Sequence, residues 1–116
     1  MTDPLRDKVK VLTAAALSKK AEGVVALDLR GRSSVTDGFL ICHGHSGRQV
    51  RAIADAITQE RGVRPLGVEG YHEGRWVLMD CNDVVVHIFV EEARRFYDLE
   101  RLWAGAPEME LDQEEL

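Results

Sequence analysis

The chain has 116 residues, a length that allows one domain around a single hydrophobic core without disulfides or metals to staple it. A hydrophobic share of 45% and a charged share of 30%, with a formal net charge of -5, are ordinary for a soluble globular protein. No apolar run approaches the roughly 20 residues of a membrane span. The N-terminal residues resemble neither a signal peptide nor a transit peptide, so we expect a cytoplasmic protein in which Cys42 and Cys81 are buried and reduced.

The first third of the chain is expected to form a helix and two strands. Asp3 is a suitable N-cap, Pro4 suits the first helical position, and Gly23 is expected to end the helix. A near-continuous apolar run over 24–29 predicts a strand that is buried on both faces, and 39–42 predicts a second strand of the same kind.

A second helix and a short strand are expected next. Ser46, with Gln49 three positions later, fits a capping box, and Gly62 supplies a helix stop. Residues 66–69 then predict a short strand. Pro65 beside it indicates a sheet edge, because proline cannot donate a hydrogen bond to a neighbouring strand.

The last part of the chain predicts a hairpin, a helix and a tail. Residues 75–80 and 84–90 read as two strands around a turn, and 91–103 as a helix. The predicted order α-β-β-α-β-β-β-α is typical of a mixed α/β fold, here a single domain over 1–103 with helices packed on a mixed five-stranded sheet. The acidic segment 104–116 is expected to be a disordered tail, since it has little apolar surface to bury.

Charge is distributed unevenly along the chain. Residues 1–65 carry eleven bases against seven acids, residues 66–100 carry three against eight, and the tail adds five acids and no base. The acidic second half disfavours binding to a phosphate backbone, which needs Lys and Arg to neutralise it. It is compatible with docking on a basic protein, and equally with a solvated acidic face that has no partner.

A metal site is one chemical interpretation of the histidines and cysteines. The candidate ligands are His43, His45, His72, His87, Cys42 and Cys81. A His-x-His pair at a strand end can hold zinc, but no further pair with the usual ligand spacing accompanies it. A hydrogen-bonded structural histidine is the favoured interpretation of His87, which lies in a valine-rich strand.

Three other kinds of chemistry receive weak support. Residues 44–47 open a helix, as phosphate sites do, but lack a complete glycine-rich motif. Cys42 and His43 are neighbours on a strand and should point to opposite faces, which disfavours a nucleophilic dyad. Asp80 and Asp83 are three positions apart across a turn, and turn formation is the favoured interpretation over a two-metal carboxylate site.

One face of the predicted hairpin is the strongest candidate for a binding surface. Trp76, Leu78 and Asp80 share one face of its first strand, and His87 lies on the same face of its second. This face is the more polar one, so we expect it to stay partly open while the other packs beneath helices. A tryptophan beside acids on an open sheet suits an interface anchor, although the periodicity alone slightly favours a core position for Trp76.

An ordered set of motifs carries a family resemblance over roughly residues 5–103. The motifs are Ala26-Leu27-Asp28, Ser33-Ser34-Val35-Thr36-Asp37, His45-Ser46-Gly47-Arg48-Gln49-Val50, Gly67-Val68-Glu69-Gly70, Trp76-Val77-Leu78-Met79-Asp80, Asp83-Val84-Val85-Val86-His87-Ile88-Phe89 and Tyr97-Asp98-Leu99-Glu100-Arg101-Leu102-Trp103. Together they resemble the ribosomal silencing factor family (RsfS, also called Iojap). The segment 47–49 departs from the pattern of many relatives, and so does the acidic tail.

The resemblance implies a function that the residues alone do not reach. It implies a non-enzymatic factor without cofactor or bound metal, with a fold similar to nucleotidyltransferases that lacks their catalytic acids. It also implies binding to the large-subunit ribosomal protein L-fourteen, steric prevention of subunit association, and repression of translation under nutrient limitation. The partner-binding positions that it implies are Trp76, Asp80, Asp83, His87 and Glu69.

Two alternatives remain open from the sequence. One is a nucleotide-binding or nucleotidyltransferase-like enzyme that shares the fold, and the other is a scaffold that forms homodimers through the same open face. The lack of a long apolar run and the acidic second half lead us to expect no membrane contact and little direct contact with nucleic acid.

Overall fold

The computed structural model describes residues 3–111 and has a mixed α/β fold. Its elements are α1 (Pro4–Leu17), β1 (Glu22–Asp28), β2 (Gly38–Gly44), α2 (Gly47–Thr58), β3 (Gly67–Glu69), β4 (Trp76–Asp80), β5 (Val84–Val90), α3 (Glu91–Tyr97), α4 (Leu99–Leu102) and β6 (Glu108–Met109). The strands form one six-stranded sheet in the order β3-β4-β5-β2-β1-β6. Only β2 and β5 run parallel, so the predicted mixed sheet is confirmed, with one strand more than expected.

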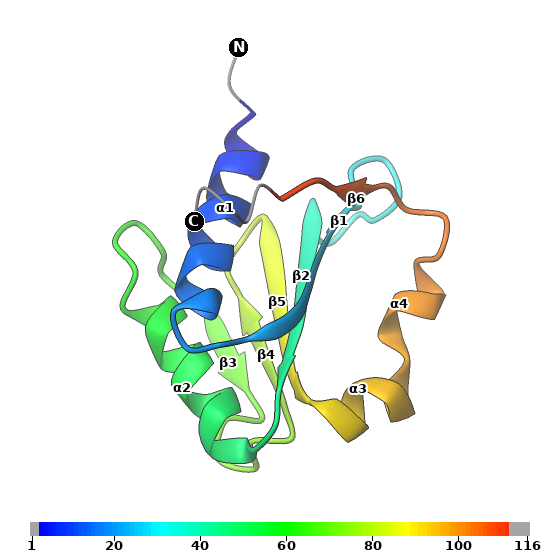
Figure 1. Cartoon of the computed structure of the whole chain (residues 1–116). Coiled ribbons are helices and arrows are strands. Elements are labelled where there is room, and N and C mark those ends of the chain that lie inside the picture. Colours follow the sequence, from blue (N-terminus) through cyan, green and yellow to red (C-terminus); the bar gives the residue numbers. More distant parts are fainter. Residues whose placement is uncertain (1–2, 112–116) are drawn as a thin grey trace.

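The helices cover the two faces of the sheet unequally. Figure 1 shows α1 and α2 on one side and the shorter α3 and α4 on the other. The main core lies beneath α1 and α2, where the side chains of Leu12, Ile53 and Met79 are all 0% exposed. A smaller cluster around Phe89 and Ala93 lies beneath α3 and α4. Within residues 3–111, no helix is long and apolar enough to cross a membrane.

Both predicted helix starts are confirmed. The Asp3 carboxylate accepts a hydrogen bond from the backbone N–H of Leu5 at 3.2 Å, and the Ser46 hydroxyl accepts one from that of Gln49 at 3.1 Å. The Gln49 side chain, however, accepts from the backbone N–H of His45 and not from that of the N-cap residue. Its amide also donates to the carbonyl oxygens of Lys19 and Lys20, so the start of α2 is joined to the end of α1.

The ends of all three predicted helices differ from the predictions, and the second helix ends at Thr58, four residues before Gly62. The first helix ends at Leu17, and a turn with Lys20 at φ 63° leads into β1, so that Gly23 lies inside this strand. The predicted helix 91–103 is divided in two, because Asp98 adopts the left-handed conformation at φ 48°. Aspartate tolerates that conformation better than most residues, since its short side chain can bond locally.

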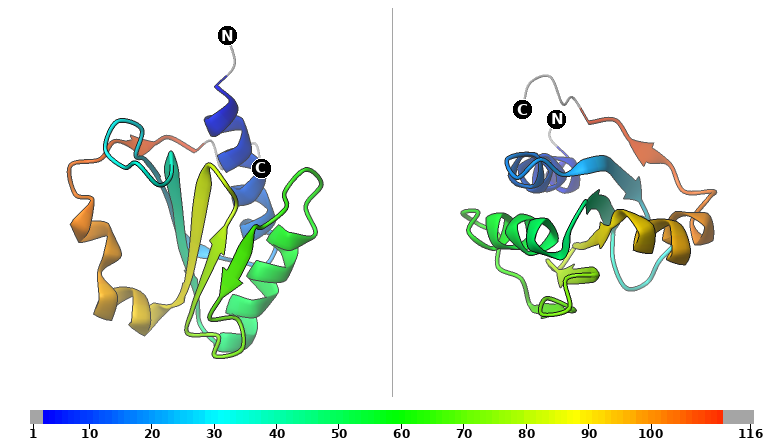
Figure 2. Two further views of the ribbon diagram at one scale, coloured as in Figure 1. Left: turned by 180° about the vertical axis from the view of Figure 1, so that it is seen from behind. Right: turned by 60° about the horizontal axis from the view of Figure 1, so that its bottom comes forward.

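Residues 104–111 of the predicted tail include a short strand that the sequence did not indicate. Glu108 and Met109 pair with β1, and the carbonyl oxygen of Pro107 accepts a hydrogen bond from Asp28 N–H at 2.8 Å. The strand β6 therefore covers what would otherwise be an exposed edge of the sheet (Figure 2). So short a strand leaves no periodic signal in the sequence. The remaining acids of the predicted tail, Asp112, Glu114 and Glu115, lie outside the described residues.

The edge position predicted for β3 is confirmed, and a glycine sets the approach of β3 to β4. Gly70 has φ +78°, and a Cβ there would collide with the carbonyl oxygen of Trp76, whereas Gly62 has φ +81° and open space around it. We expect Gly62→Ala to cost about 1 kcal/mol from backbone strain alone, and Gly70→Ala about 2 kcal/mol or more, because the collision adds to the same strain. Urea unfolding of both variants measures the difference in stability. Equal losses would show that the contact with the Trp76 carbonyl oxygen adds nothing to the cost at position 70.

Candidate functional site

An uncovered area of sheet lies over β3, β4 and β5, on the side of α3 and α4. On β4 the side chains of Trp76, Leu78 and Asp80 are half-buried, whereas Val77 and Met79 on the opposite face are 0% exposed. The expectation of a partly open face is therefore confirmed. We call the surface formed by Glu69, Trp76, Leu78, Asp80 and Val85 the open face.

The register of the strands gathers these residues. Glu69 on β3 lies directly across from Leu78, and Asp80 lies across from Val85 on β5. Residues paired in this way point to the same side of an antiparallel sheet, with Cβ atoms about 5 Å apart. Two carboxylates, those of Glu69 and Asp80, thus flank an apolar strip on one surface.

A groove of about 560 Å³ opens on this side of the sheet. It is lined by Arg32, Ser33, Ser34, Val35, Thr36, Phe39, Leu78, Asp80, Val85, His87 and Trp103. The loop residues form one wall and Trp103, which follows α4, forms part of the other. The Thr36 hydroxyl fixes the loop by donating to the carbonyl oxygen of Asp83 at 3.0 Å.

Aromatic rings hold Trp76 in place. Its indole stacks on Phe89 with ring centroids 4.9 Å apart and lies 4.7 Å from the ring of Tyr97 on α3. The indole Nε1–H donates to His87 Nδ1 at 3.1 Å. Trp76 is therefore both packed on the smaller cluster and partly exposed, a combination that suits an interface anchor because its orientation is fixed before a partner arrives.

His87 lies beneath the open face and not on it. Its side chain is 4% exposed, and burial lowers the pKa of its imidazole to about 4. The ring is therefore neutral near pH 7, and accepting from Trp76 at Nδ1 places its proton on Nε2. Among the described residues, Nε2 has no hydrogen-bond partner. The interpretation of His87 as a hydrogen-bonded structural histidine is thereby confirmed, whereas its contact with a partner stays a prediction.

The carboxylates of Asp80 and Asp83 do not form a pair. Asp83 accepts from Lys8 Nζ of α1 at 2.6 Å, which turns its side chain toward the main core helices and away from the open face. Asp80 accepts from the backbone N–H of Asn82 at 2.9 Å, as the turn interpretation predicted. A carboxylate pair that could hold two metal ions is therefore not assembled here, because the Asp83 carboxylate is bound by Lys8.

The remaining chemical candidates are dispersed. Cys42 and Cys81 are buried and free, as expected, and burial raises the pKa of the Cys42 thiol to about 12. His45 bonds to the Glu22 carboxylate at 2.5 Å, while His72 lies in an exposed turn. Within residues 3–111, no three His, Cys, Asp or Glu side chains are placed to hold a metal ion.

Several residues that line the groove were not predicted from the sequence. Phe39 enters because β2 pairs with β5 in parallel, which places it beside Val85. Trp103 reaches the groove because the chain bends at Asp98, and its ring meets Phe39 edge-on at 5.7 Å. The alternation of 39, 41 and 43 was a readable signal for the face of β2, but one sequence does not show which strand lies next to it.

Comparison with known proteins yields one family. The family model described as "Ribosomal silencing factor during starvation" matches residues 2–116. The Bacillus subtilis protein named "Ribosomal silencing factor RsfS" is 49% identical over 107 residues, which cover 90% of this chain and 91% of that protein.

Solved structures agree with this match. A crystal structure of a protein from Bacillus halodurans has a TM-score of 0.80 at 46% identity, covering 91% of this chain and 99% of that one. A second, from Chromobacterium violaceum, has a TM-score of 0.81 at 33% identity, covering 92% and 91%. The resemblance read from the ordered motifs is thereby confirmed, and this chain belongs to the ribosomal silencing factor family.

Proposed function

We propose that this protein binds the large ribosomal subunit through protein L-fourteen and sterically blocks its association with the small subunit, repressing translation when nutrients are limiting. Family membership supports a regulatory role at the ribosome. The observation that carries the docking surface is the open face itself, where a half-buried, pre-oriented Trp76 lies on the same surface as Glu69 and Asp80.

The chemistry of the open face suits a basic protein partner. Aromatic anchors with a polar rim are the usual centre of binding energy, and acids around them favour approach by a positively charged surface. Glu69 is exposed and Asp80 half-buried, so both can meet such a surface. Of the five positions proposed for the interface, Trp76, Asp80 and Glu69 would contact the partner, whereas His87 and Asp83 would hold the surface in shape.

The test is cosedimentation with purified large subunits, followed by a subunit-joining assay. We expect the protein to pellet with large subunits, isolated L-fourteen to compete for it, and joining to slow when the protein is added before the small subunit. Addition after joining should have little effect, because the surface is then occupied. Failure to pellet would reject ribosome docking, pelleting without competition would reject L-fourteen, and unchanged joining would reject the steric block.

A further inference from the structure

One wall of the docking surface is built by two short helices. The helix α3 supplies Tyr97, whose ring lies against Trp76, and the end of α4 supplies Trp103, which lines the groove. The two helices have 7 and 4 residues. Helices this short are not stable alone in water, so their position is set by contacts with the rest of the fold.

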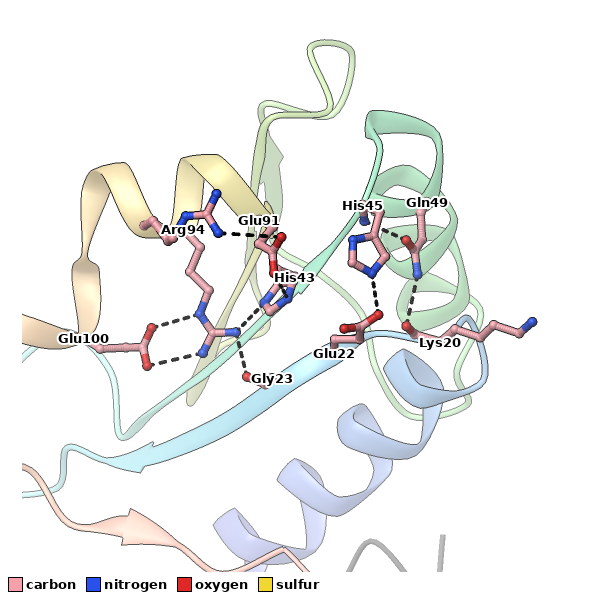
Figure 3. A network of polar contacts seen from close by, with 10 residues as sticks. Lys20, Glu22, Gly23, His43, His45, Gln49, Glu91, Arg94 and Glu100 are labelled. Atoms are coloured by element: carbon pink, nitrogen blue, oxygen red, sulfur yellow. Dashed lines mark hydrogen bonds and ion pairs between the residues drawn. The ribbon is translucent and has the colours of Figure 1, made fainter.

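Arg94 of α3 provides polar contacts to three other elements. Its guanidinium donates to the carbonyl oxygen of Gly23 on β1 at 2.7 Å and bonds to His43 Nδ1 on β2 at 2.8 Å. It also donates from Nε and Nη2 to both carboxylate oxygens of Glu100 on α4, at 2.9 and 3.2 Å. Figure 3 shows the guanidinium between these groups. With 13% of its side chain exposed, Arg94 is well shielded from water.

The contact between Arg94 and His43 exists only while His43 is neutral. Arginine can only donate, so His43 Nδ1 must carry a lone pair to accept. Protonation would place an N–H and a positive charge against the guanidinium.

The other titratable groups around His43 are Glu91 of α3, Glu22 of β1 and His45, which follows β2. The two carboxylates favour the protonated ring. Burial and Arg94 outweigh them, and the pKa of His43 lies below its ordinary value. Protonation of this ring therefore acts against the contact that joins α3 to the sheet.

We propose that Arg94, with neutral His43 as its acceptor, is the positioning residue of the docking surface: it fixes α3 and α4 so that Tyr97 supports Trp76 and Trp103 completes the groove. Neither Arg94 nor His43 belongs to the open face, so both act through the aromatic wall. The inference rests on the proposed docking function, and it makes binding weaker once the pH is low enough to protonate His43, below the ordinary histidine pKa.

Four variants test this inference. Arg94→Ala removes the network. Arg94→Lys keeps the positive charge but loses the several N–H donors of the planar guanidinium. His43→Asn keeps an acceptor at the Nδ1 position but cannot be protonated. Arg95→Ala is the matched control on the same helix, because Arg95 is 72% exposed and makes only a 3.7 Å pair with Glu91. Both tryptophans of the chain, Trp76 and Trp103, lie at this site, so intrinsic fluorescence reports on the wall directly.

Binding to large subunits and tryptophan emission are measured at about pH 7.5 and in steps down to about pH 5, because the pKa of His43 lies below the ordinary histidine value of about 6.5. We expect Arg94→Ala and Arg94→Lys to weaken binding about tenfold at the higher pH and to shift the emission, while Arg95→Ala does neither. The wild type should lose affinity and shift its emission on acidification. His43→Asn should match the wild type at the higher pH and lose most of that dependence.

Two results would overturn the inference: a pH profile of His43→Asn identical to that of the wild type, or Arg94 variants that match Arg95→Ala in emission. If Arg94→Ala does not fold, as judged by circular dichroism, Arg94→Lys and His43→Asn still test the inference. If the wild type fails to bind large subunits, the proposed function fails, and the fluorescence measurements test the positioning role by themselves.

Discussion

Replacing Trp76 with alanine is expected to weaken binding to the large ribosomal subunit by about 2 kcal/mol or more, a loss of roughly 30-fold in affinity. The indole is half-buried, is stacked on Phe89, contacts the tilted ring of Tyr97, and is hydrogen-bonded to His87. A partner would therefore meet a ring that has already lost its rotational freedom. Its removal takes away apolar contact area and also loosens its neighbours.

Controls separate binding from folding. Trp76→Phe keeps a ring for packing and loses the N–H, so it should fold well and bind with intermediate affinity. Val11→Ala removes a comparably exposed apolar side chain, 39% exposed, from α1 on the other side of the sheet, and it should bind like the wild type. If folded Trp76→Ala keeps full affinity, the interface lies elsewhere on the molecule.

Unfolding stability is expected to fall by about 3 kcal/mol as the pH is lowered from 6.5 to about 4, because His87 is buried in its neutral form. In the unfolded chain this imidazole takes up a proton near its ordinary pKa of 6.5, whereas in the folded chain burial delays protonation until about pH 4. The unfolded state therefore binds more protons across this interval. The contribution of neutral His87 to the stability of the folded protein is complete above pH 6.5 and is lost on acidification.

Urea unfolding followed across this pH range measures the effect. His87→Asn offers an oxygen to the Trp76 N–H but does not titrate, so its stability should change less with pH than that of the wild type. His72→Asn, in an exposed turn, is the matched control and should retain the wild-type dependence. Equal slopes for His87→Asn and the wild type would contradict a buried neutral His87. The lowered pKa of His43 acts in the same direction.

The two faces of the β4–β5 hairpin could be predicted because side chains alternate strictly along a strand. Leu78 and Asp80 were assigned to the correct surface, and Val77 and Met79 to the core, from the period of two alone. Local capping was equally readable, since Ser46 acts on a backbone N–H only three residues away. Exposure of His87 was not readable, because the side chains that cover it come from other parts of the chain.

The sequence by itself therefore determined the mixed α/β fold, the strand faces, the helix starts and, through its ordered motifs, the family. These depend on local geometry or on the order of residues along the chain. Only the tertiary structure decided the parallel pairing of β2 with β5, the addition of β6, the turning of Asp83 toward Lys8 and the contacts of Arg94. Each of these joins segments far apart in sequence, and the entropy of closing such loops is offset only by packing that no single segment displays.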